Sequence, residues 1–260
     1  MGELFRLRAY DEVASTNEIV KRAIEAGEPE GLAVCARAQV AGYGRQGRTW
    51  SSPEGGVYLS LLLRPRCDIA QLPTLSLVAG IAVRRAIGSF AHVGAADRVR
   101  LKWPNDVVLE EPHDGMDPGL RKIAGISLES HAGGICVGVG VNVVAPDHVG
   151  RSLGKYEPAY VEELAGDVTV AVVRDAVLAS FAACYECWLE GGFAMFSDEY
   201  REHAALFGCS VAVENVDGSL VAQGTVEGID GSGRLVVSPV GSAEVLHLSS
   251  GEVHLARVGS

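Results

Sequence analysis

The sequence predicts an α+β protein of 260 residues that ends in a small β-module. Two observations support this prediction. Up to about residue 206, apolar strand-like runs alternate with helical stretches, which is typical of helices packed on a sheet. From Phe207 onwards the chain changes to short alternating strands with Asp-Gly and glycine-rich turns, which indicates a small β-barrel of about fifty residues.

The strands expected in the first part are Phe5–Tyr10, Leu32–Val40, Val57–Leu63, Val99–Lys102, Val107–Leu109, Arg121–Glu129 and Ile135–Val144. The helices expected there are Glu18–Ala26, Pro73–Ile87, Pro158–Ala165, Val170–Leu189 and Met195–Ala205. The barrel strands are expected at Val211–Glu214, Leu220–Ile229, Arg234–Pro239, Ala243–Leu248 and Glu252–Ala256. Strands were assigned where apolar residues are continuous or alternate, and helices where they recur at three- to four-residue spacing. A tight turn at Ala132-Gly133-Gly134 is expected to join two of the strands.

The composition excludes several classes of protein. A formal net charge of −11 argues against nucleic acid as the main partner, because binding phosphates requires clustered lysine and arginine. No apolar run approaches the ~18 residues that cross a bilayer, so we expect no membrane partner and a cytoplasmic location. Six cysteines in this chain are more consistent with reduced thiols than with a disulfide scaffold, and we assign no protein metal site. The Cys184-x-x-Cys187 pair fits half-buried helix thiols.

The segment Gly42–Trp50, GYGRQGRTW, is the most informative stretch of the chain. Its glycines alternate with Arg45 and Arg48, and no acidic residue occurs from Gly31 to Pro53. Backbone N–H groups of such a loop can close on a small anion while guanidinium groups bind carboxylate or phosphate. The alternative is an ordinary glycine-rich hairpin with two solvated arginines.

Polar residues surround this loop in the predicted fold. Ser15-Thr16-Asn17 precedes a helix and is expected to cap it, or to present hydroxyl and N–H groups to a ligand. The strand before the loop ends near Gln39, whose amide should point into the mouth of the loop.

Lysine is rare enough to be informative, because only four of the 22 basic residues are lysine. Lys102 begins KWPND, where Pro104 should end the strand and place Lys102 at its tip. Lys122 begins KIAGI on a later strand. The polar segment Glu110–Gly119 between these two motifs is expected to be a loop.

The strand ICVGVGVNVV, which ends near Asn142, alternates glycine with β-branched residues. Because glycine has no side chain, another backbone or a flat ligand should approach this strand closely.

Taken together, these motifs resemble those of biotin protein ligases of the kind without a DNA-binding domain. The resemblance runs from about Tyr10 to the C-terminus and covers Ser15–Asn17, Gln39–Trp50, KWPND, KIAG and the glycine strand, in the family's order. It implies a central mixed sheet flanked by helices, similar to class II aminoacyl-tRNA synthetase cores, over residues 1–206. Residues 207–260 would then form an SH3-like barrel.

The resemblance also implies the reaction. Biotin and ATP would form biotinyl-5'-AMP and pyrophosphate, with Mg²⁺ carried on the phosphates, and the biotinyl group would pass to a lysine of a biotin carboxyl carrier domain. The implied catalytic residues are Lys122, Arg45, Arg48 and Lys102. The implied biotin- and ATP-binding residues are Ser15, Thr16, Asn17, Gln39, Gly42, Tyr43, Gly44, Arg45, Trp50, Asn105, Lys122, Gly125 and Asn142. The resemblance leaves a homodimer open.

One position departs from the family pattern. The second residue of the loop is usually arginine in this family, whereas here it is Tyr43, which loses a charge and keeps a hydrogen-bonding hydroxyl. Two other interpretations therefore stay open. One is a lipoate–protein ligase, which shares the adenylating core, and the other is a catalytically weak biotin-binding regulator.

Overall fold

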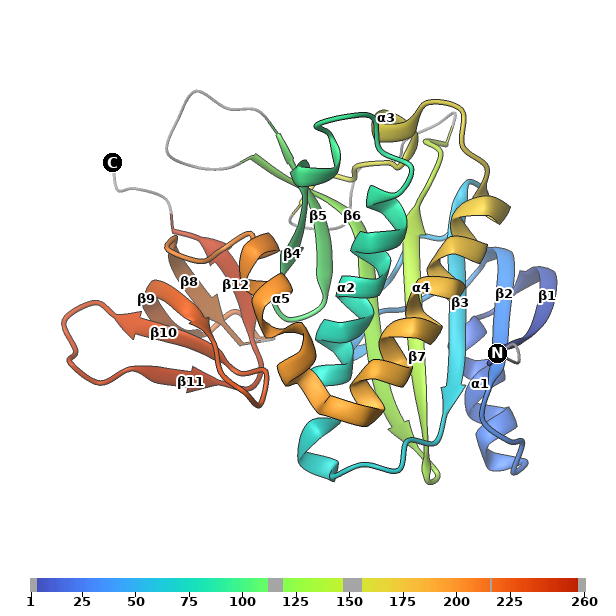
Figure 1. Ribbon diagram of the computed structural model, residues 1–260, viewed down its shortest axis with the longest axis horizontal. Coiled ribbons are helices and arrows are strands. Elements are labelled where there is room, and N and C mark those ends of the chain that lie inside the picture. The colour runs from blue at the N-terminus through green and yellow to red at the C-terminus, as the bar shows by residue number, and fades with distance from the viewer. Residues whose placement is uncertain (1–3, 112–118, 147–155, 216, 257–260) are drawn as a thin grey trace.

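The computed structural model describes residues 4–111, 119–146, 156–215 and 217–256 of the chain. The strands are β1 Arg6–Val13, β2 Leu32–Gln39, β3 Gly56–Leu63, β4 Val99–Lys102, β5 Asp106–Glu111, β6 Gly119–His131, β7 Gly134–Asn142, β8 Ser210–Glu214, β9 Leu220–Ile229, β10 Leu235–Pro239, β11 Leu246–Leu248 and β12 Glu252–Leu255. The helices are α1 Thr16–Glu25, α2 Thr74–Gly88, α3 Glu162–Ala165, α4 Val170–Gly191 and α5 Ser197–His203. The strands form two separate sheets (Figure 1).

The larger sheet has seven strands in the order β1-β2-β3-β7-β6-β5-β4. Within the described part of the chain, β1 and β2 run parallel and the remaining neighbours are antiparallel, so the sheet is mixed. β6 and β7 form a hairpin in which both turn residues, Ala132 and Gly133, have positive φ. The tight turn that the sequence predicts is therefore confirmed. Two positive φ values suit a two-residue hairpin turn because they match the twist of the paired strands.

Helices cover both faces of this sheet. Alternate residues along a strand point to opposite faces. Leu32, Val34 and Leu62 pack against α1, whereas Ala33 and Leu61 belong to the larger core that contains α2 and α4. In Figure 1, α2 and α4 lie in front of the sheet. The mixed α+β arrangement with flanking helices is therefore confirmed.

The second sheet has the order β11-β10-β9-β8-β12, and its strands are antiparallel. Val211 and Val253 of this sheet belong to the same apolar core as the larger sheet. A hydrogen bond from Trp103 Nε1 to the carbonyl oxygen of Gly233, at 3.0 Å, also joins the two. The C-terminal sheet is consequently fastened to the KWPND turn.

Several predicted elements were wrong in part. Only the α3 part of the expected helix Pro158–Ala165 is helical. Residues 157–159 are extended and lie beside Lys122, where β6 is no longer paired with β7. There they form hydrogen bonds with the backbone N–H and C=O groups of Lys122. The stretch Met195–Ala205 contains a 3-10 segment before α5. Glu110 and Glu111 belong to β5 and Gly119 to β6 rather than to a loop, and residues 112–118 of that expected loop lie outside the described residues.

Candidate active site

A pocket of about 960 Å³ lies between the glycine loop, the KWPND turn, strands β6 and β7, and one edge of the C-terminal sheet. Its size is near the upper end of the usual range for small-molecule sites. The predicted residues that line it are Thr16, Asn17, Gln39, Tyr43, Gly44, Arg45, Arg48, Trp50, Lys102, Asn105, Lys122, Gly125 and Asn142. Residues from distant parts of the sequence therefore share one cavity.

Two predicted residues, Ser15 and Gly42, do not line this pocket. Ser15 is the N-cap residue of α1 and is buried, but its side chain makes no capping hydrogen bond, so the capping prediction was wrong for this hydroxyl. Gly42 supports the base of the loop. A Cβ atom there would lie 2.5 Å from Ser52 Oγ and 2.8 Å from the carbonyl oxygen of Trp50, so the close approach of these groups requires glycine.

One end of the pocket is a polar corner, lined by Thr16, Asn17, Gln39 and Ser127 and backed by the buried Ser60. Gln39 Oε1 accepts hydrogen bonds from the backbone N–H of Thr16 at 2.8 Å and from its hydroxyl at 3.1 Å. Ser60 Oγ donates toward Asn17 Oδ1 at 2.6 Å, and Asn17 Nδ2 donates to Ser127 Oγ at 3.2 Å. The corner thus offers neutral donors and acceptors that are already oriented by one another.

Ser60 and Ser127 of this region are not among the residues predicted from the sequence. Both serines are buried, and both lie on strands made mainly of apolar residues. A serine inside a continuous apolar run is the signal that could have identified them, because a buried hydroxyl requires a hydrogen-bond partner.

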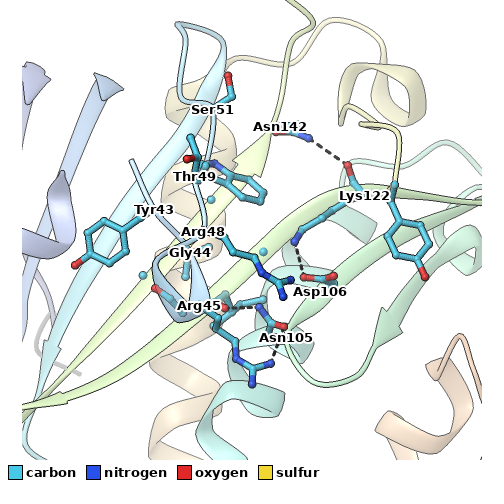
Figure 2. Close-up of a pocket in the computed structure, with 18 of the residues that line it drawn as sticks. Tyr43, Gly44, Arg45, Arg48, Thr49, Ser51, Asn105, Asp106, Lys122 and Asn142 are labelled. Atoms are coloured by element: carbon cyan, nitrogen blue, oxygen red, sulfur yellow. Dashed lines mark hydrogen bonds and ion pairs between the residues drawn. The ribbon is translucent and has the colours of Figure 1, made fainter. Parts of the chain in front are cut away.

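The other end is a cationic corner, which surrounds the carboxylate of Asp106 (Figure 2). Lys122 Nζ lies 2.6 Å from Asp106 Oδ1, and Lys102 Nζ lies 3.8 Å from Asp106 Oδ2. Burial would raise the pKa of Asp106, but the charges of Lys122 and Lys102 outweigh this effect and lower it. Asp106 therefore stays ionised and holds both lysines in place.

Asp106 belongs to KWPND but was not among the predicted site residues. Its importance depends on the pairing of β5 with β6, in which Asp106 lies opposite Gly125, three residues along β6 from Lys122. Tyr156 was also missed. Its ring lies 4.7 Å from Lys102 Nζ, and burial raises its pKa to about 12.

The glycine loop is anchored at several points. Arg45 Nη1 donates to Asn105 Oδ1 at 3.2 Å, and Arg48 forms an ion pair with Glu252 of β12. Within the loop, the backbone N–H of Gly44 donates to the carbonyl oxygen of Arg48 at 2.8 Å. The alternative of a hairpin with two solvated arginines is wrong for Arg45, which is half-buried and bonded to Asn105, whereas Arg48 stays exposed beside Glu252.

The flat group that approaches the glycine strand is the indole of Trp50. A Cβ atom on Gly140 of β7 would lie 2.6 Å from Trp50 Cε2, and Lys122 Nζ lies 5.1 Å from the centre of the Trp50 rings. Trp50 Nε1 is buried and has no hydrogen-bond partner among the residues described.

Gly140→Ala is expected to push Trp50 out of position, because a Cβ atom cannot approach a ring carbon to 2.6 Å. Overpacking of this kind costs about 1–3 kcal/mol of stability. Because Trp50 lines the pocket, its displacement should also weaken the binding of biotin, the ligand that the resemblance implies, about tenfold. Isothermal titration calorimetry would measure the affinity. The control is Gly231→Ala, since nothing lies within 4 Å of a Cβ at that position. Equal affinities of the two variants would contradict the role given to Gly140.

Comparisons with known proteins agree with one another. Residues 10–143 match the model of the "Biotin/lipoate A/B protein ligase family". The chain is 34% identical over 223 residues to the biotin–[acetyl-CoA-carboxylase] ligase of Paracoccus denitrificans, covering 82% of this chain and 86% of that protein. The corresponding ligase of Mycobacterium tuberculosis is 30% identical over 263 residues, which covers 96% of this chain and 89% of that protein.

The fold comparison gives the same result. The structure of the biotin protein ligase from Aquifex aeolicus in complex with biotin and ATP matches with a TM-score of 0.79 and 27% identity. The match covers 97% of this chain and 99% of that one. Among the described residues, no helix is both long and apolar enough to cross a membrane.

Proposed function

The chain belongs to the biotin/lipoate A/B protein ligase family, and we propose on this basis that its pocket joins biotin to ATP. The protein is an ATP-dependent biotin–[acetyl-CoA-carboxylase] ligase. It activates biotin as biotinyl-5'-AMP and transfers the biotinyl group to the carrier domain of the carboxylase. The observation that carries the proposal is that one pocket has a neutral polar corner at one end and a cationic corner at the other.

The polar corner suits the ureido group of biotin, and the cationic corner suits the reacting carboxylate and phosphates. The ureido group of biotin is neutral and polar, and the polar corner around Asn17 and Gln39 presents both donors and acceptors to it. The carboxylate of biotin then attacks the α-phosphorus of ATP, the bond to the β-phosphate breaks, and pyrophosphate leaves. Lys122 and Arg45 offset the negative charge at this step, since both line the same pocket.

In the second step the neutral amine of a carrier lysine attacks the acyl carbon of biotinyl-5'-AMP. The bond to the phosphate oxygen breaks, AMP leaves with the electron pair, and the amine loses a proton to water. No protein nucleophile takes part, so the pocket needs only to bind and orient the reactants and to neutralise their negative charge.

Mg²⁺ is proposed to arrive on the phosphates of ATP. The described residues contain no cluster of three or more histidine, cysteine, aspartate or glutamate side chains that could hold a metal. Asp106, the carboxylate of the cationic corner, is already paired with lysines. Magnesium commonly keeps several waters and is bound partly through substrate phosphates, which fits a pocket of this kind.

Further proposals concern the organisation of the protein. We propose that residues 1–206 form the catalytic domain, with a core related to class II aminoacyl-tRNA synthetases, and that residues 207–260 form an SH3-like barrel. The seven-stranded sheet and the separate five-stranded sheet support this division. A cytoplasmic location and a homodimer are proposed from the family alone, and size-exclusion chromatography with light scattering would test the latter.

The deciding experiment is ATP–pyrophosphate exchange by the purified full-length protein, with biotin, lipoate or neither acid added. Exchange that depends on biotin is expected, because the polar corner presents oriented donors and acceptors that suit a ureido group. Exchange with lipoate instead would favour a lipoate ligase. Biotin binding without exchange would favour a regulator, and either result would overturn the proposal.

A further inference from the structure

Tyr43 fastens the glycine loop to helix α1, on the side away from Arg45 and Arg48 (Figure 2). Its hydroxyl donates to Glu18 Oε1 at 2.7 Å and accepts from Lys21 Nζ at 2.8 Å. Glu18 and Lys21 lie one turn apart on α1 and also pair with each other, at 3.2 Å. One hydroxyl of the loop is thus held between a carboxylate and an ammonium group.

The contacts continue from Lys21 into the polar corner. Lys21 Nζ lies 2.6 Å from Glu129 Oε2 at the end of β6. The other oxygen of Glu129 accepts a hydrogen bond from Asn17 Nδ2 at 3.2 Å, and Asn17 in turn contacts Ser60 and Ser127. A continuous set of hydrogen bonds and ion pairs therefore links the loop to the corner, and such networks fix the orientation of their members.

We propose that Tyr43 is a positioning residue for biotin binding. It holds the loop against α1 before the ligand arrives and, through Lys21 and Glu129, it keeps Asn17 oriented for the ureido group. The proposal rests on the proposed function, because it takes biotin as the occupant of the polar corner.

The chemistry of the position explains why a tyrosine suits it. A phenolic hydroxyl donates and accepts at the same time, so it can serve Glu18 and Lys21 together. Arginine has donors only and would face the ammonium group of Lys21. Burial raises the pKa of Tyr43, so the hydroxyl stays protonated at neutral pH and keeps its donor role. Its hydrogen bond also lowers the pKa of Glu18, which keeps the acceptor charged.

The test compares Tyr43→Phe with Tyr185→Phe in the full chain. Tyr185 is a matched control, because its hydroxyl also donates to a carboxylate, Glu30 at 2.6 Å, but it does not line the pocket. Without ligand, trypsin should cleave after Arg45 and Arg48 about tenfold faster in Tyr43→Phe, as expected for the loss of a charge-assisted hydrogen bond. Biotin Kd and KM should rise about tenfold while kcat of pyrophosphate exchange changes less than about twofold.

Two further variants sharpen the test. Tyr43→Arg should not reach the wild-type affinity for biotin, because an arginine side chain cannot accept a hydrogen bond from Lys21. Glu18→Gln combined with Tyr43→Phe should weaken biotin binding by less than the sum of the two single effects, since the two changes share the Tyr43–Glu18 hydrogen bond.

Several outcomes would overturn the inference. These are unchanged cleavage and KM in Tyr43→Phe, a fall in kcat at constant KM, or equal effects in Tyr185→Phe. Failure of the proposed function is a separate result, because the wild-type protein would then show neither biotin binding nor exchange. Even in that case, the rate of loop cleavage without ligand decides whether Tyr43 fastens the loop.

Discussion

Lys122→Ala is expected to lower biotin-dependent pyrophosphate exchange about a hundred- to a thousandfold, the usual effect of removing one charge-stabilising group from an active site. Lys122 lies in the pocket beside Asp106 and over the rings of Trp50. Its ammonium is therefore positioned to offset the charge that builds up when a carboxylate attacks a phosphate. Biotin affinity should fall much less, because the polar corner contains none of these groups.

The control for this prediction is Arg66→Ala, which removes an exposed positive charge that does not line the pocket. Thermal melts of both variants would show that they are folded. If folded Lys122→Ala retained most of its exchange activity, Lys122 would be a structural partner of Asp106 and not a catalytic group.

Asp106→Ala is expected to be the most destabilising change in the site, at about 3–5 kcal/mol of unfolding free energy. Asp106 is paired with Lys122 and with Lys102, and the side chain of Lys102 is only 5% exposed. Removal of the carboxylate leaves these positive charges close together without the group that neutralises them. Urea denaturation at pH 7 would measure the loss, and Asp167→Ala, which removes an exposed carboxylate, is the control.

The pH dependence of stability gives a second measure of how much the Asp106 carboxylate stabilises the folded protein. Its pKa is lower in the folded protein than in the unfolded chain, so its contribution is complete above the unfolded value of about 3.9. The contribution decreases as the pH falls from there through the folded pKa. The stability difference between wild type and Asp106→Ala should therefore shrink on acidification below about pH 4. A constant difference between pH 7 and pH 2 would show that folding does not lower the pKa of Asp106.

Much of the fold was predictable because local patterns determine it. Gly56–Leu63 is a continuous apolar run, and the structure buries this strand completely. The break at Pro104 follows from the missing backbone donor of proline, and the pairing of β4 with β5 turns there. The expected helix at Pro158–Ala165 failed because the free backbone groups of Lys122 bind residues 157–159, a long-range contact that overrides local preference.

The sequence by itself determined the chemistry of the site and most of its members. A glycine loop with arginines and no acids, two scarce lysines in defined motifs and a glycine-alternating strand are local features, and each restricts what can bind. Only the tertiary structure decided how these parts meet. The contact of Asn17 with Ser127 spans 110 residues, and the ion pair of Arg48 joins the loop to Glu252 near the other end of the chain. Likewise, the sequence shows only that Tyr43 lacks the charge of the arginine usual at this position in the family. The structure shows that its hydroxyl bonds two charged side chains, Glu18 and Lys21. The physical reason is that hydrogen bonds and ion pairs depend on distance in space, which strand pairing and helix packing set and local pattern does not.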